Sequence, residues 1–154
     1  MTDASRACWL AAGLAGLVVV ADQVAKQLVE QRIAVGEEVD VLGPLKLTLT
    51  HNEGVAFGLA GGSGAPLAVL TLAALAVVVY LFARDPARPL MWVAAGLLGG
   101  GAIGNLIDRV RAGAVTDYVD LPHWPAFNLA DAAITCGVLL LAFVYVREAE
   151  RGGR

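Results

Sequence analysis

Four long apolar runs constrain the fold of this chain more than any other feature of its sequence. Each run has roughly the 17–25 residues that a helix needs to cross the hydrocarbon core of a bilayer. Only 16% of the 154 residues are charged, well below the share in a soluble domain. The sequence therefore predicts an integral membrane protein that is mainly α-helical, a single membrane-embedded domain over 1–154 with four transmembrane helices at about 7–28, 66–83, 90–107 and 129–146.

The segment between the first two runs is polar and predicts a small extracytoplasmic β element at about 37–58. Apolar and polar residues alternate through 39–50, as in a half-buried strand. The segment leads to Asn52 and Gly54, and a glycine allows another backbone to approach closely. The amide of Asn52 can form an Asx turn, or it can hold a peptide backbone or a carboxylate, and the pattern leaves both open.

Basic residues predict the orientation of the chain in the membrane. Four spans place both termini on one side, where arginines are dense in short segments. Most of the 14 acidic residues fall in the longer segments on the other side. Because cytoplasmic segments carry the excess of Lys and Arg, both termini are expected in the cytoplasm.

The cysteines and histidines give no sign of a metal site. Cys8 and Cys136 lie in apolar runs near opposite membrane faces, and we expect them to be buried small apolar residues. His51 and His123 do not have metal-ligand spacing. The net charge of −3 gives no support for nucleic-acid binding. We therefore expect no metal, no cofactor and no nucleic-acid partner.

Polar side chains gather where the third and fourth runs meet. Asn105, Asp108 and Arg109 share one face at the end of the third run. Asn128 and Asp131 open the fourth run, where an asparagine cap and a carboxylate near a helix N-terminus are both favourable. A local ion network or a simple helix cap explains these residues, but charged groups inside a membrane are costly and usually functional.

Asp117 lies in the segment between these two runs and can approach Asp131 if that segment folds back. Two neighbouring carboxylates do not both ionise easily, so such a pair holds one acid and one base. The pair can activate water and protonate a leaving amine without a covalent nucleophile. From spacing alone, the favoured explanation is that Asp117 and Asp120 are ordinary solvated loop acids, and the dyad is the alternative.

Two further features lie within the apolar runs. Asp22 and Lys26 share a face near the end of the first run; spacing favours an interfacial ion pair, and a tether toward the polar residues is the alternative. Gly96, Gly100 and Gly104 form a stripe where another helix can pack closely. A scaffold protein would use the stripe without the polar cluster, and a transporter would carry acids deep in a span, whereas these acids lie near helix ends.

Five segments resemble, in order, the motifs of the bacterial lipoprotein signal peptidase family, signal peptidase II, and together they extend over nearly the whole chain. Each motif is weak alone, and the ordered set is specific. The segments are Asp22–Lys26, Asn52–Phe57, Gly104–Arg109, Val115–Asp117 and Pro125–Asp131. The chain departs from the family where Thr116 and Tyr118 flank Asp117, since valine and phenylalanine are frequent there.

The resemblance implies an aspartic endopeptidase of the bacterial cytoplasmic (inner) membrane. Asp117 and Asp131 would be its catalytic dyad, with Asp117 preferred over Asp120 because it holds the motif position. The implied substrates are prolipoproteins, cleaved just before a diacylglyceryl-modified cysteine near the extracytoplasmic face, amid membrane lipid. We expect a monomer. The implied supporting residues are Asn52, Asn105, Arg109 and Asn128, with Asp22 and Lys26 as a structural pair.

Overall fold

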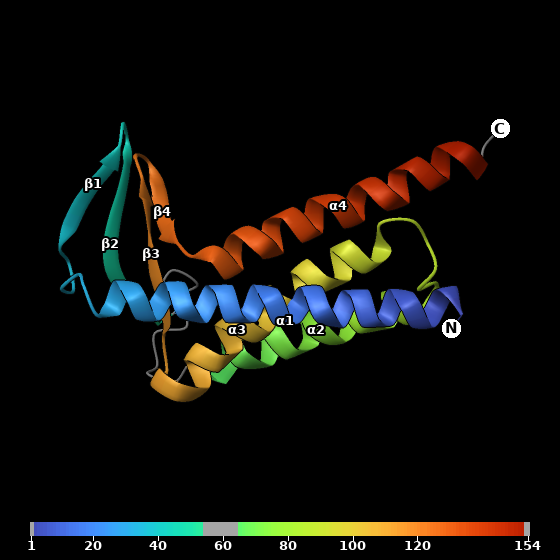
Figure 1. The fold of residues 1–154 in the computed structure, drawn as a ribbon, viewed down its shortest axis with the longest axis horizontal. Helices are drawn as coiled ribbons and strands as arrows, with labels where there is room; N and C mark the ends of the chain where they lie inside the picture. The colour runs from blue at the N-terminus through green and yellow to red at the C-terminus, as the bar shows by residue number, and fades with distance from the viewer. Residues whose placement is uncertain (1, 54–64, 153–154) are drawn as a thin grey trace.

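The computed structural model describes residues 2–53 and 65–152, which form helices joined to one small antiparallel sheet at their end (Figure 1). This arrangement confirms the predicted mainly helical class with a β element. In chain order the elements are α1 (Asp3–Glu30), β1 (Glu38–Leu42), β2 (Leu45–Asn52), α2 (Ala65–Arg84), α3 (Met91–Ala112), β3 (Val115–Leu121), β4 (Trp124–Phe127) and α4 (Leu129–Gly152).

The helices have the length and hydropathy of membrane spans. Among the described residues, α1, α3 and the Leu129–Arg147 part of α4 are long and apolar enough to cross a membrane. The Val69–Arg84 part of α2 is a shorter apolar helix. The start of α1 and the end of α4 both lie at the end of the molecule opposite to the sheet (Figure 1).

Helix α3 is the central helix, and its glycine stripe is the surface against which α1 packs. A methyl group on Gly100 would lie 2.7 Å from the Cβ atom of Val18. One on Gly104 would lie 2.8 Å from a carboxylate oxygen of Asp22. Real Cβ atoms do not approach this closely, so the predicted packing role of the stripe is confirmed.

Helix α3 extends to Ala112, five residues beyond the end predicted from hydropathy. Asp108 and Arg109 therefore lie inside the helix and not beyond it. The helix ends at Gly113, which has a left-handed φ of 77° and whose N–H bonds the carbonyl of Arg109 at 3.0 Å. This is the usual glycine C-cap, which the charged residues concealed from a hydropathy-based prediction.

The sheet has four strands in the order β1-β2-β3-β4, all antiparallel. The first two were predicted from alternation. The segment between α3 and α4 was interpreted as a loop, and that interpretation was wrong because it forms β3 and β4. One row of apolar side chains crosses the sheet through the cross-strand partners Val39, Leu47, Val119 and Phe127.

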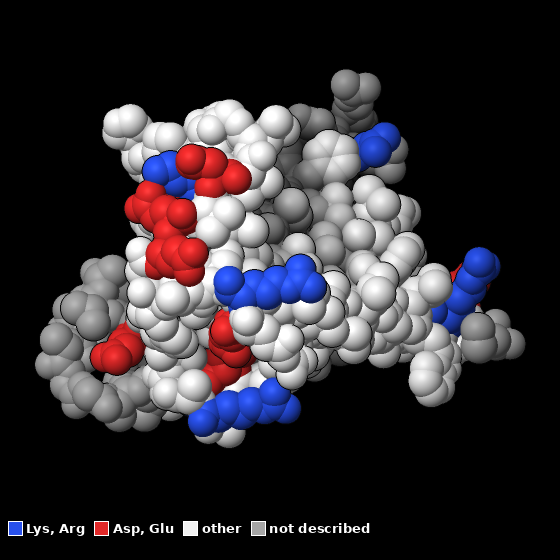
Figure 2. Space-filling model, turned by 60° about the vertical axis from the view of Figure 1, so that its left-hand side comes forward, with Lys and Arg blue, Asp and Glu red and all other residues white. Residues whose placement is uncertain are grey.

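Tyr118 and Leu49 pack against the end of α1, in a cluster with Val29 and Ile33. This cluster fixes the sheet to the helices, because its members come from α1, from the segment after it and from two strands. On the face shown in Figure 2, acidic side chains gather over the sheet end together with several basic ones, and a broad uncharged surface separates this group from the charged residues at the far end.

The two cysteines differ from the prediction. Cys8 and Cys136 are both free and exposed on the protein surface, so they are not buried in the core. Both lie on helices whose outer faces are apolar, and a small apolar side chain suits a surface that faces lipid as well as it suits a core. The burial prediction was wrong because hydropathy does not distinguish the two environments.

Candidate active site

Asp117 lies on β3, and its carboxylate is buried among hydrogen-bond donors. Its side chain is only 2% exposed. One oxygen accepts from Nδ2 of Asn52 on β2 at 3.0 Å, and the other accepts from Nδ2 of Asn128 at 2.7 Å. Burial raises the pKa of Asp117 to about 6, and the negative charge of Asp131 acts in the same direction, against the two amide donors.

Asp131 lies in the first turn of α4 and forms a reciprocal cap with Asn128. The backbone N–H of Asp131 donates to Oδ1 of Asn128 at 2.8 Å, and the backbone N–H of Asn128 donates to Oδ2 of Asp131 at 3.3 Å. This is the geometry of a capping box, in which each residue satisfies a free N–H of the other. The predicted cap is thus confirmed, and it orients the carboxylate of Asp131.

Asn128 joins the two carboxylates to the end of α3. Its side chain is fully buried, and its amide donates to Asp117 while its backbone donates to Asp131. Asn105 of α3 donates to Oδ1 of Asp131 at 2.7 Å and accepts from Asn128 at 3.2 Å. The structure therefore brings Asp117, Asp131, Asn105 and Asn128 into one hydrogen-bonded group.

Lys26 of α1 is bonded to this group through Asn105, and its ammonium group contacts three acceptors in all. Its Nζ atom is 2.8 Å from Asp22, 2.6 Å from Asp108 and 3.1 Å from Oδ1 of Asn105. Lysine is strongly hydrated in water, so burying it at 4% side-chain exposure requires such a set of partners. The ammonium group links the carboxylates of α1 and α3 to the amide that holds Asp131.

Asp22 also contacts α4 directly. Its Oδ1 atom accepts from the backbone N–H of Ala130 at 2.9 Å, and its side chain is fully buried. A carboxylate at a helix N-terminus is stabilised by the free N–H groups there. The ion pair that spacing favoured is present at 2.8 Å. The bond from Ala130 shows that Asp22 also ties α1 to α4, so the tether interpretation is supported as well.

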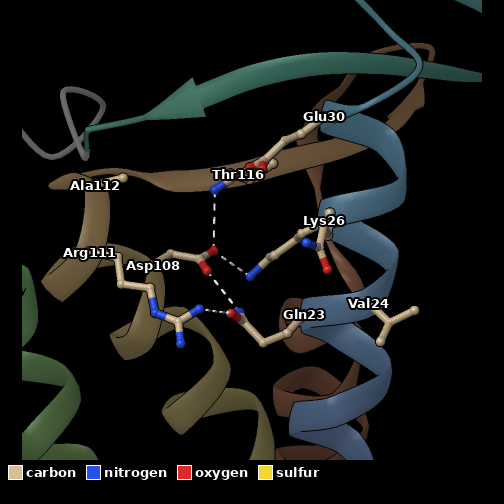
Figure 3. A pocket seen from close by; sticks show the side chains of 9 residues that line it. Gln23, Val24, Lys26, Glu30, Asp108, Arg111, Ala112 and Thr116 are labelled. Carbon is tan, nitrogen blue, oxygen red and sulfur yellow. Dashed lines mark hydrogen bonds and ion pairs between the residues drawn. The ribbon is translucent and has the colours of Figure 1, made fainter.

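Gln23 is a residue of this network that the sequence analysis missed. Its side-chain amide donates to Asp108 at 2.8 Å, and its oxygen accepts from the exposed Arg111 at 3.3 Å (Figure 3). Asp108 in turn accepts from the backbone N–H of Thr116 on β3 at 3.3 Å. The available signal was a polar side chain next to Asp22 within an apolar run.

Two cavities lie at the level of the carboxylates. The first, of about 290 Å³, is polar and lies between α1, the end of α3 and β3 (Figure 3). The second, of about 430 Å³, is mostly apolar and includes Asp131 in its wall. Its other lining residues come from the last two strands and α4: Leu121, Trp124, Phe127, Ala132, Thr135 and Cys136.

The remaining predicted residues are placed as follows. Arg109 is partly buried and donates to the backbone carbonyl of Asn105 at 3.3 Å. Asp120, the rival of Asp117, pairs across the sheet with Lys46 and forms none of the hydrogen bonds of the Asn128 group. Gly54, and the part of the predicted β region over 54–58, lie outside the described residues.

The chain is similar in sequence to known proteins over most of its length. Residues 14–147 match the family model described as signal peptidase (SPase) II. The lipoprotein signal peptidase of Brucella ovis is 46% identical over 141 residues, covering 88% of each chain. That of Moorella thermoacetica is 41% identical over 143 residues, covering 92% of this chain and 95% of the relative. The chain belongs to the signal peptidase II family.

The fold of this family member is also similar to that of a solved bacterial membrane enzyme. The two chains are 33% identical with a TM-score of 0.83, over 92% of this chain and 90% of that one. A second solved bacterial membrane enzyme gives a TM-score of 0.82 at 34% identity, over 88% and 91% of the two chains. The chain is therefore a membrane protease of the aspartic type, as its family is.

Proposed function

We propose that this chain removes signal peptides from prolipoproteins by hydrolysing the peptide bond before a diacylglyceryl-modified cysteine. Asp117 and Asp131 are the catalytic dyad in this proposal. The observation that carries it is the bonding of both carboxylates to Asn128, one through its side chain at 2.7 Å and one through its backbone at 3.3 Å. Two acids held together where membrane helices end are suited to a substrate whose scissile bond lies at the interface.

The environments of the two carboxylates suggest different roles. Asp117 is the more enclosed, and its raised pKa makes it the group that holds the shared proton. Asp131 faces the cavity of about 430 Å³ and can meet water there. As the water oxygen attacks the carbonyl carbon, the carboxylate of Asp131 accepts its proton, and the carboxyl of Asp117 donates a proton to the leaving amine.

The other polar residues hold this pair in place. Asn105 and Asn128 orient the two carboxylates, and Lys26 with Asp22 fixes Asn105 and the start of α4. Asn52 bonds Asp117 from the last position of β2, and the extended substrate would pass beside this end of the strand. We assign the sheet, with the segment that includes Gly54, the role of a clamp for that peptide.

The same proposal covers location and assembly. We assign the chain to the bacterial cytoplasmic membrane as a single peptidase domain over 1–154 that acts as a monomer. Both termini would be cytoplasmic and the dyad would lie near the extracytoplasmic face. The arrangement of both described chain ends opposite to the sheet supports this orientation, as does the excess of acids over the sheet (Figures 1 and 2).

The test is cleavage of a purified prolipoprotein by the purified enzyme in lipid vesicles. The diacylglyceryl-modified precursor should yield a product whose first residue is the modified cysteine, as read by mass spectrometry. The same precursor without diacylglyceryl should be cleaved much more slowly. Equal cleavage of both forms, or cleavage at another bond, would contradict the proposed substrate.

A further inference from the structure

The two residues that flank Asp117 carry hydroxyl groups that bond to two different helices. Thr116 donates through Oγ1 to Oε1 of Glu30 on α1 at 2.7 Å. Tyr118 accepts through its hydroxyl from the backbone N–H of Leu129, the first residue of α4, at 3.2 Å. Both flanking side chains are buried, at 5% and 7% exposure. The segment of β3 that carries Asp117 is thus bonded to α1 through the residue before Asp117 and to α4 through the residue after it.

The geometry of a strand separates these two bonds from the reacting face. Side chains alternate between the faces of a strand, so Thr116 and Tyr118 share one face and Asp117 projects from the other. The two hydroxyls bond Glu30 and the backbone N–H of Leu129, whereas the carboxylate of Asp117 bonds the side-chain amides of Asn52 and Asn128. They act on the backbone that carries Asp117 and leave its own hydrogen bonds intact.

The two bonds reach the elements against which Asp117 must be aligned. Leu129 lies between Asn128 and Asp131, so the Tyr118 bond sets β3 against the first turn of α4. Glu30 is the last residue of α1, the helix that provides Lys26, and its bond with Thr116 borders the polar cavity (Figure 3). The acceptor of the Thr116 bond at 2.7 Å is a carboxylate, and a bond to an ionised group is stronger than one between neutral groups.

We propose that Thr116 and Tyr118 are positioning residues that align Asp117 with Asp131 through their bonds to Glu30 and Leu129. The inference rests on the proposed catalytic role of Asp117. Displacing a reacting group by about 1 Å costs as much as about 100-fold in rate, so two bonds that fix one strand segment affect turnover without touching substrate. Valine at position 116 and phenylalanine at position 118, which are frequent in the family, would pack in the same places but form neither hydrogen bond.

The experiment compares Thr116→Val and Tyr118→Phe, which keep the shape of each side chain and remove its bond. Purified variants in vesicles are assayed for kcat and KM on the modified prolipoprotein, and thermal unfolding is followed in parallel. We expect kcat to fall about tenfold in each variant, a part of the loss that about 1 Å of misplacement causes, with KM changed less than about twofold. Thr116→Ser keeps the hydroxyl and should retain most of the turnover.

Thr48→Val is the matched control, because Thr48 lies in β2 of the same sheet and is buried at 6% exposure, so its side chain is not part of the surface that would clamp the peptide. It should keep the kcat of the unmodified enzyme. Unchanged kcat in both Thr116→Val and Tyr118→Phe, with Asp117→Asn inactive, would overturn the positioning role alone. An active Asp117→Asn variant would overturn the proposed function as well, so the two failures are distinguishable.

Discussion

Replacing Lys26 by methionine tests how much the buried ion cluster contributes to stability. The ammonium lies 2.8 Å from Asp22 and 2.6 Å from Asp108, and the three side chains are 4%, 0% and 10% exposed. Removing one partner of such a buried pair leaves an uncompensated charge and costs about 3–5 kcal/mol. At roughly 2–4 °C per kcal/mol for a chain of this size, the midpoint of thermal unfolding in detergent should fall on the order of 10 °C.

Lys46→Met is the matched control for this prediction. Lys46 also forms an ion pair, 2.6 Å from Glu38, but the two side chains are 40% and 55% exposed. Exposed pairs contribute about 0–1 kcal/mol because water and salt screen them. The same substitution at an ion pair of similar length should therefore leave the unfolding midpoint almost unchanged.

A second variant separates charge from packing at the cluster. Asp108→Asn combined with Lys26→Met removes one of the two stranded carboxylates and should recover part of the loss. A loss no larger for Lys26→Met than for Lys46→Met would refute the reasoning, because it would show that burial of the ion cluster carries no cost. Failure of the double variant to recover stability would show that the loss comes from packing.

Two further perturbations follow from the structure. Gly100→Ala places a methyl group 2.7 Å from the Cβ atom of Val18 and should destabilise the protein by about 1–3 kcal/mol. Gly16→Ala is the control, because its methyl group would meet nothing within 4 Å. Equal unfolding midpoints for the two variants would contradict the close packing of α1 on α3. Asn52→Ala removes a hydrogen bond that lowers the pKa of Asp117, so the pKa of Asp117 should rise. The fall of kcat/KM on the alkaline side, expected near pH 6 in the free enzyme, should therefore move to higher pH. A shift to lower pH would assign this fall to another group.

The helices and the first hairpin were predictable because their side chains face uniform surroundings. Long apolar runs face lipid or other helices, and in the first hairpin Leu47 and Leu49 of β2 pack on the cluster at the end of α1. The later strands were missed because β3 buries Thr116 and Asp117 among polar partners, which breaks the alternation that identifies a strand. The β-branched and aromatic residues of β3 were the remaining signal.

The dyad, its cap and most of the supporting residues could be proposed from motif order and spacing, but the contacts among the supporting residues could not. Lys26 contacts Asp108 and Asn105 across 82 and 79 positions of sequence, and Gln23 contacts Asp108 across 85. Such contacts depend on how α1 packs on the glycine stripe of α3, which hydropathy does not specify. Helix pairing therefore decides which polar residues support the site.

The most direct test of the account is the turnover of Asp117→Asn and Asp131→Asn, measured by single-turnover cleavage of the modified prolipoprotein in vesicles. Asp120→Asn is the control, because Asp120 lies on the same strand as Asp117 but pairs with Lys46. We expect no measurable cleavage by either dyad variant, each folded as judged by thermal unfolding, and full cleavage by Asp120→Asn. Cleavage at the unmodified rate by either dyad variant would contradict the central claim that these two carboxylates carry out the reaction.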